Sequence, residues 1–196
     1  MTALNCPAGA IVPAFTDLRE HYSAAQRHYH TLDHIRAVLD TIRALGGTEA
    51  MPSLLLAVWF HDVIYDSRAH DNEEKSAAHA RRILQQLGVS EAILSETERL
   101  ILLTTTHSPA PGDAPGAILA DADLAILGAP ETEYDMYAQA IRREYAWVPE
   151  ARYREGRRAV LEHFLRRPRI YATAEMFTRA ETAARNNIRR EVAALG

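Results

Sequence analysis

The seven residues from Leu54 to Phe60 are all apolar, and this run constrains the fold more than any other part of the sequence. Pro52 precedes the run, and proline is favoured in the first turn of a helix. A helix that is apolar around its whole circumference must be covered on every side by other elements. We therefore expect this helix to lie at the centre of a bundle.

Apolar residues elsewhere recur at three- and four-residue spacing, which is typical of amphipathic helices, and few segments resemble strands. Glycines mark several helix ends, among them Gly46-Gly47, Gly88 and Gly128. The predicted helices cover residues 13–27, 31–45, 52–60, 72–87, 91–107, 117–127, 131–146, 149–166 and 171–194. With 196 residues, of which 47% are hydrophobic, we predict one all-α domain over residues 1–196, a bundle of about eight or nine helices.

Composition narrows the classes of function. A net charge of −4 argues against a protein that binds nucleic acids stably by neutralising their phosphates. Cys6 is the only cysteine, which excludes an internal disulfide and a thiolate zinc site. The first residues lack the pattern of a secretory signal, and no apolar run approaches the ~20 residues of a membrane helix. We expect a cytoplasmic protein without a membrane anchor, and the sequence leaves open whether it forms a homodimer.

A histidine and an aspartate, His61 and Asp62, follow directly after the apolar helix. Burying a carboxylate there is costly unless it is paired or bound to a cation. Taken alone, such a pair is better explained by hydrogen bonds to nearby backbone. Its interpretation therefore depends on whether other ligand-type side chains are expected to point into the same core.

Three further positions meet that condition. His34 is followed by apolar residues at core-facing spacing, and Asp121 and Asp123 lie in an otherwise apolar helix in which Asp123 shares a stripe with Leu119 and Ile126. Two imidazoles with one or two carboxylates suit a borderline or harder divalent cation, with positions left for water and substrate. We therefore predict a metal site with mixed nitrogen and oxygen ligands.

His107 lies on a predicted stripe with Leu100 and Thr104. Such a histidine can be an ordinary core residue that is hydrogen-bonded to backbone. It can also orient a ligand, contact a substrate phosphate or bind a second metal. The residues alone leave these alternatives open.

Taken in order, His34, His61-Asp62 and Asp123 resemble the motifs of the HD superfamily of metal-dependent phosphohydrolases, in particular its small stand-alone members. The resembling stretches are residues 27–35, 59–66, 71–77 and 121–128, all within the span 27–128. The C-terminal helices, residues 131–194, share only a general likeness. Any one of these motifs is weak evidence, whereas all of them in the right order form a specific pattern.

The resemblance implies a helical fold in which the first histidine, the His-Asp pair and the late aspartate bind one divalent metal. By this comparison the ligands are His34, His61, Asp62 and Asp123, with Asp121 as the alternative to Asp123. The sequence does not distinguish Mn, Mg, Co, Ni, Fe and Zn. Relatives with two metals carry two more histidines before the last aspartate, and of His70, His79 and His107 only the last is well placed here. A second metal is therefore doubtful.

The resemblance further implies hydrolysis of a phosphate ester, in a nucleotide or another small phosphorylated metabolite, by a metal-activated water. Asp62 would also orient that water, and Glu73 or Glu74 could act as general base, although charge complementarity at a helix N-terminus explains Glu74 as well. The substrate-binding candidates are His30, His107, Arg27 and Lys75. For Arg27 and Lys75, plain solvation at the surface is an equally good explanation.

Two other functions remain open. Some helical proteins of this type resemble di-iron oxygenases, which require two irons and more ligands than the sequence supplies with any clarity. A non-catalytic module that binds a nucleotide and regulates a partner is the other alternative. It is favoured where ligands have been lost, and here all the expected ligands are present.

Overall fold

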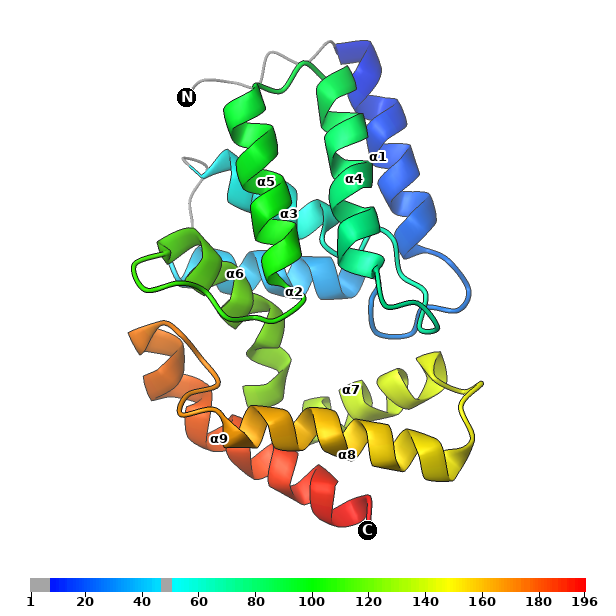
Figure 1. The fold of residues 1–196 in the computed structure, drawn as a ribbon, viewed down its shortest axis with the longest axis vertical. Helices are drawn as coiled ribbons and strands as arrows, with labels where there is room; N and C mark the ends of the chain where they lie inside the picture. Colours follow the sequence, from blue (N-terminus) through cyan, green and yellow to red (C-terminus); the bar gives the residue numbers. More distant parts are fainter. Residues whose placement is uncertain (1–7, 47–50) are drawn as a thin grey trace.

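In the computed structural model, the description covers residues 8–46 and 51–196 (Figure 1). All regular elements within these ranges are helical, so the predicted all-α fold is confirmed. The helices are α1 (Ala8–Tyr22), α2 (Leu32–Ala44), α3 (Pro52–Phe60), α4 (Asn72–Gln86), α5 (Glu91–Leu103), α6 (Ala114–Asp123), the 3-10 helix η1 (Leu124–Gly128), α7 (Glu131–Glu144), α8 (Glu150–Arg166) and α9 (Ala174–Ala194). No helix in the described part combines the length and apolarity needed to cross a bilayer.

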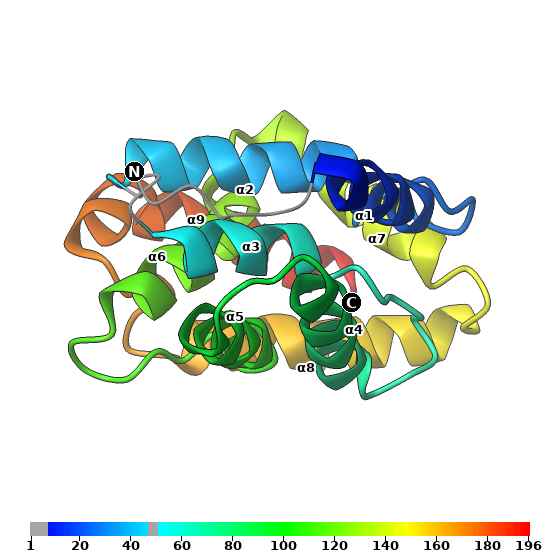
Figure 2. The same cartoon turned by 90° about the horizontal axis from the view of Figure 1, so that it is seen from above.

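The apolar helix α3 lies in the middle of the first six helices, as its composition requires. Leu54, Ala57 and Val58 are at most 1% exposed. Figure 2 shows α3 between α2 on one side and α4 and α5 on the other. Side chains from α1 to α6 complete this first hydrophobic cluster. Three other apolar residues of α3 stay partly exposed, so the helix is not covered on every side. Its buried residues fix the position of those that follow it.

A second hydrophobic cluster joins η1 to the three C-terminal helices α7, α8 and α9. In Figure 1 these helices form the lower part of the molecule, and α6 with η1 leads from the upper part into it. Gly128 ends η1 against α9, where an added Cβ would lie 2.8 Å from the Cβ of Ala180 and 2.9 Å from the hydroxyl of Tyr171. The connection between the two clusters is therefore tightly packed.

Several helix ends differ from the sequence prediction. Helix α1 begins at Ala8 rather than Pro13 and ends at Tyr22, with Pro13 inside it. Helix α6 begins earlier than expected because the side chain of Asp113 caps it, accepting a hydrogen bond from the amide of Gly116. Gly88, with φ +73°, ends α4 as predicted. Gly47 and Cys6 lie outside the described residues.

Helix α5 ends at Leu103, so His107 is not on a helical stripe as the sequence suggested. Its φ of 49° makes it the one non-glycine residue with positive φ among those described. This left-handed conformation is uncommon for a residue with a Cβ, although histidine tolerates it better than most. The chain therefore turns sharply at His107 before it reaches α6.

Candidate metal centre

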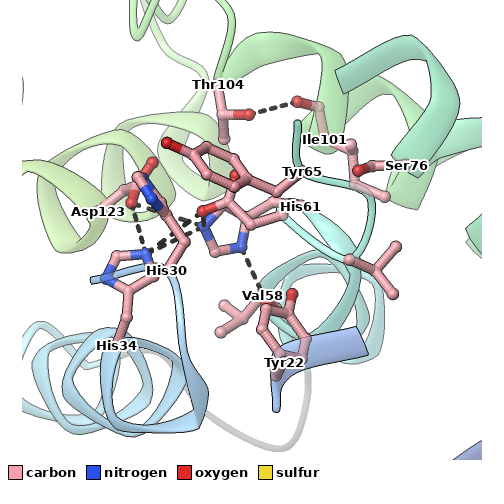
Figure 3. Close-up of polar contacts among 12 residues, drawn as sticks. Tyr22, His30, His34, Val58, His61, Tyr65, Ser76, Ile101, Thr104 and Asp123 are labelled. Atoms are coloured by element: carbon pink, nitrogen blue, oxygen red, sulfur yellow. Dashed lines mark hydrogen bonds and ion pairs between the residues drawn. The ribbon is translucent and has the colours of Figure 1, made fainter. Parts of the chain in front are cut away.

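Three helices bring four predicted ligands together. His34 comes from α2, His61 and Asp62 from the end of α3, and Asp123 from the last residue of α6. Figure 3 shows His34, His61 and Asp123 pointing toward one another. One ligand atom from each of these three residues lies within 4.8 Å of the others. Residues distant in the sequence therefore form a buried group that is compatible with a metal ion.

The interatomic distances fit a shared cation. The Nε2 atoms of His34 and His61 are 3.2 Å apart. Two imidazole nitrogens bound at about 2.0–2.1 Å to one ion, in tetrahedral or octahedral geometry, would be separated by roughly 2.9–3.4 Å. Asp123 Oδ1 lies 3.1 Å from His34 Nε2, and Asp62 Oδ2 lies 3.1 Å from His61 Nε2. Asp62 Oδ2 is also 3.7 Å from His34 Nε2, which places it at the edge of the group.

The backbone sets the tautomer of His61. Its Nδ1 donates to the carbonyl oxygen of Val58 at 2.9 Å, because a carbonyl can only accept. Neutral His61 therefore presents the lone pair of Nε2 to the centre, as a metal ligand must. Both imidazoles are almost completely removed from solvent, with side chains 2% exposed for His34 and 1% for His61.

Charges in the centre are strongly coupled. Burial alone would lower the pKa of His61, but the carboxylates of Asp62 and Asp123 raise it well above its usual value. Burial alone would raise the pKa of each aspartate, but His61 and the other histidines hold both well below the usual range. The two buried carboxylates thus require a positive charge beside them, which either a proton on His61 or a divalent cation can supply.

Asp121 points away from the centre, so it is not the alternative ligand that the sequence left open. Its carboxylate accepts hydrogen bonds from the amides of Ala172 and Thr173 at 2.6 and 2.7 Å and from the Thr173 hydroxyl at 2.6 Å. These contacts fix the start of α9. Of the two aspartates, only Asp123 belongs to the buried ligand group.

His107 contacts the centre through Asp123. Its Nε2 donates to Asp123 Oδ2 at 2.7 Å, while Asp123 Oδ1 faces His34. Its own carbonyl accepts a hydrogen bond from Arg167 of the C-terminal part at 3.2 Å. His107 therefore orients a candidate ligand, and its positive φ places the ring where it can do so.

Arg27 is buried, which was not expected of a phosphate-binding residue. Its guanidinium donates to the carbonyl oxygens of His30, Asp62 and Val63 at 2.7–3.0 Å. The rings of Tyr22 and Tyr65 flank it at 5.0 and 5.4 Å. We therefore revise its role: Arg27 ties the loop before α2 to the loop after α3, and so holds the His-Asp pair in place.

Glu144, at the end of α7, is a functional residue that the sequence reasoning missed. Its Oε1 accepts hydrogen bonds from the amides of residues 28–30 at 2.7–3.1 Å. Its Oε2 accepts from His30 Nδ1 at 2.7 Å and from the Tyr65 hydroxyl at 2.9 Å. Tyr137, Ile141 and Glu144 share one face of α7, so an acidic residue on an apolar stripe was the available signal.

Asp62 and Glu144 together act on the imidazole of His30. The His30 ring stacks on Tyr65, with centroids 4.2 Å apart, and lies beside the ring of His34. Burial alone would lower the pKa of His30, but the carboxylates of Asp62 and Glu144 raise it above its usual value. Burial alone would raise the pKa of Glu144, but His30 and the backbone amides lower it to about 2. His30 therefore lies beside the centre with its pKa raised by two carboxylates.

The two remaining candidates, Glu73 and Lys75, lie in the first turn of α4. Lys75 is exposed and pairs with Asp71 at 2.8 Å, so its ion pair is local. No hydrogen bond or ion pair among the described residues links Glu73 to the metal ligands, and its role as a general base stays a prediction. Helix α4 does support the centre through Ser76, which exchanges hydrogen bonds with the backbone of Ile64 at 3.1 and 3.2 Å.

A cavity of about 520 Å³ opens beside the centre, between α2, α6, η1 and α7. His34 and Asp123 contribute to its wall, as do Tyr29 and Tyr137, whose rings are 4.7 Å apart. The exposed Arg143 lies at its margin. A small molecule in this cavity would touch two of the candidate ligands.

The structure thus brings together His34, His61, Asp62 and Asp123, with His30 and His107 beside them, and separates Asp121 and Lys75 from them. The same centre depends on Glu144 and Arg27 for its geometry. In the comparisons with known proteins, no family model, no curated protein and no solved structure matched the chain.

Proposed function

We propose that this chain is a metal-dependent phosphohydrolase of the HD type, which cleaves a phosphate ester of a nucleotide or another small phosphorylated metabolite. The observation that carries the proposal is the 3.2 Å separation of two buried imidazole nitrogens with two carboxylates beside them. Burying two carboxylates in an apolar bundle is costly without a compensating cation. The order of these residues along the chain, which resembles the HD pattern, supports the same assignment.

His34, His61, Asp62 and Asp123 would hold one divalent metal. Such an ion lowers the pKa of a water and draws charge from a phosphoryl oxygen. Asp62 is the more exposed carboxylate, with a side chain 17% exposed against 13% for Asp123, and it lies at the edge of the group. It is therefore the residue we assign to orient the attacking water. Asp123, fixed by His107, would serve as a ligand only.

His30 is our candidate for proton transfer to the leaving group. Its Nδ1 is bonded to Glu144, which leaves Nε2 for an exchangeable proton. The carboxylates of Asp62 and Glu144 raise the pKa of this ring, the direction that favours a general acid. Tyr65, stacked on the ring, limits its rotation.

The cavity supports a small substrate. Its volume of about 520 Å³ lies within the range of roughly 300–1,000 Å³ typical of small-molecule sites. Tyr29 and Tyr137 can face a planar or sugar group, and Arg143 can meet a negative charge at the margin. Lys75, which pairs with Asp71 on α4, is no longer needed for phosphate binding.

The test is a screen of nucleotides and sugar phosphates with Mn²⁺, Mg²⁺, Co²⁺, Ni²⁺, Fe²⁺ and Zn²⁺, in which phosphate release is measured. We expect His61→Ala and Asp62→Ala to abolish release, and the exposed His70→Ala, a matched control, to retain it. If either variant hydrolyses esters at the parent rate, the proposed centre is wrong.

Measurements on the same purified protein distinguish the hydrolase from an oxygenase and from a binding module. Metal analysis that finds two irons per chain at this centre would favour an oxygenase. A chain that binds nucleotides in the cavity but releases no phosphate with any of the six metals would be a binding module. One metal per centre with phosphate release, lost in His61→Ala, supports the hydrolase.

A further inference from the structure

A second group of ligand-type residues lies between α1 and α4. Asp17 and His21 are four residues apart on α1 and so share one face of the helix, and His79 comes from the middle of α4. One ligand atom from each residue lies within 4.8 Å of the others. We propose that these three residues form a separate binding site for a divalent transition metal of the zinc class, which joins the two helices.

The geometry of the three side chains fits this role. Asp17 Oδ2 lies 2.6 Å from His79 Nε2 and 3.8 Å from His21 Nδ1. The two imidazole rings are 5.1 Å apart and nearly perpendicular, with an interplanar angle of 65°. Two imidazoles and a carboxylate favour Zn²⁺, Co²⁺, Ni²⁺ or Cu²⁺ over Mg²⁺ or Ca²⁺, which prefer oxygen ligands.

The backbone of α1 holds the ring of His21 in place. Its Nδ1 donates to the carbonyl oxygen of Asp17 at 2.8 Å, which fixes the ring and leaves a lone pair on Nε2. A histidine that binds a metal through one nitrogen usually donates from the other in this way. A metal bound at Nε2 would keep this hydrogen bond, whereas a metal bound at Nδ1, the nitrogen 3.8 Å from Asp17 Oδ2, would replace it.

His79 requires one adjustment on binding. In the metal-free protein, Arg82 donates to its Nδ1 at 3.2 Å, so Nε2 carries the proton and donates to Asp17. A metal at Nε2 moves that proton to Nδ1 without changing the charge of the imidazole, and the Arg82 contact then breaks. Because Arg82 is exposed, its side chain can move into solvent.

The site is partly open, as a site that takes up an ion must be. The side chains of Asp17, His21 and His79 are 29%, 33% and 11% exposed. A shallow cavity of about 330 Å³ between α1 and α4 has Asp17 in its wall. Neither histidine lines this cavity, but all three side chains are partly exposed, so an ion can reach them from solvent.

A metal here would strengthen the support of the first centre. Tyr22, next to His21, donates to the carbonyl of Trp59 at 3.0 Å and flanks Arg27. The ring of His79 lies 6.3 Å from that of Phe60, the residue before His61. Joining α1 to α4 would thus stabilise the segment that carries the His-Asp pair. The proposal does not depend on the phosphohydrolase assignment, because it concerns binding alone.

The test is the stoichiometry of Zn²⁺ bound to the full chain, measured by equilibrium dialysis, together with the visible absorption of bound Co²⁺. We expect His21→Gln and His79→Gln each to bind one equivalent less than the parent and to lose one component of the Co²⁺ spectrum. Changes that merely disturb the orientation of a ligand weaken metal binding roughly 10–100-fold, so loss of a ligand should weaken it more.

Two controls keep the result interpretable. His70→Gln removes an exposed histidine on the loop before α4 and should keep the parent stoichiometry. Asp123→Asn disables the first centre, and in that background His79→Gln should still remove one equivalent. If His21→Gln and His79→Gln, with helical spectra like that of the parent, bind as much Zn²⁺ as His70→Gln, the proposal is overturned.

Discussion

Asp121 and Asp123 are two residues apart in α6, and their surroundings give them opposite tasks. Asp123 ends the helix among three histidines, and Asp121 satisfies two backbone amides and a hydroxyl at the start of α9. A carboxylate with three such donors contributes to stability, whereas one between imidazoles contributes a charge to the centre. Substitution of each by asparagine therefore tests the two tasks separately.

We expect Asp123→Asn to lose metal from the first centre while the helical content is kept, because an amide oxygen is a poor substitute for the anionic ligand. Asp121→Asn should keep the metal, but its free energy of unfolding should fall by about 1–3 kcal/mol since one donor then faces an amide NH₂. Urea denaturation and metal analysis of both variants give the comparison. Equal metal loss in the two variants would contradict the assignment of Asp123.

Glu144 connects the C-terminal helices to the centre, so its substitution should affect both the stability of the fold and the position of His30. In Glu144→Gln the loop of residues 28–30 and His30 lose a charged acceptor. We expect a loss of about 2–3 kcal/mol in unfolding free energy. We also expect a lower kcat with little change in KM, because His30 is no longer held. Glu131→Gln, an exposed change on the same helix, is the control and should alter neither.

The stability of the protein at low pH should also depend on Glu144. The pKa of Glu144 falls from an ordinary 4.5 to about 2 on folding. Its charge therefore stabilises the fold fully above about pH 4.5, and that stability is lost as the pH falls toward 2. Between these pH values, the free energy of unfolding should change more steeply with pH for the parent than for Glu144→Gln. Parallel curves would show that Glu144 is not the group that titrates.

At the scale of elements, the junction between η1 and α9 is the most tightly packed connection in the second cluster. Gly128 leaves no room for a Cβ, which would meet the side chain and the carbonyl of Ala180 at 2.8 and 3.0 Å. We expect Gly128→Ala to lower the free energy of unfolding by about 1–3 kcal/mol, the usual cost of overpacking. Thermal denaturation measures it, with Gly156→Ala, where a Cβ meets open space, as the control. A Gly128→Ala variant as stable as Gly156→Ala would show that α9 can shift.

The sequence predicted the elements well where a local cause acts. The apolar run of α3 and the glycine with positive φ after α4 follow from periodicity and steric rules. The convergence of His34 with His61 was expected from their core-facing positions and from the resemblance to a known family. The start of α1 was mispredicted because Pro13 is tolerated inside the helix. The conformation of His107 was mispredicted because a left-handed turn at a histidine has no marker in the sequence.

The features that the sequence did not predict depend on contacts between segments that are remote along the chain. Arg27 appeared to be a surface cation because nothing local indicates that three carbonyls from two loops surround it. Glu144 contacts residues more than a hundred positions away, and only its place on an apolar face hinted at burial. The group formed by Asp17, His21 and His79 requires α1 and α4 to be adjacent, which no helix pattern specifies.

At the scale of the whole molecule, a metal ion at the first centre would compete with a proton. Burial lowers the pKa of His61, but Asp62 and Asp123 outweigh it, so the folded metal-free protein binds a proton there more strongly than the unfolded chain does. Because the folded pKa lies above the unfolded one, this proton stabilises the metal-free fold below about pH 6.5, and that stability is lost as the pH rises through the folded value. A metal ion must displace the proton, so its affinity rises with pH.

The difference in Tm between the metal-loaded and chelated protein should therefore widen from pH 6 to pH 8. An ion at a free concentration 100-fold above its Kd adds about 2.7 kcal/mol, which corresponds to roughly 5–10 °C in a chain of this length. The second group, between α1 and α4, would bind metal as well, so the contribution of the first centre is the part that Asp123→Asn removes. If the difference narrows with rising pH, metal binding does not require loss of the proton on His61. If it persists unchanged in Asp123→Asn, the metal is not bound at the first centre, and the four side chains form a network of hydrogen bonds and not a cation site.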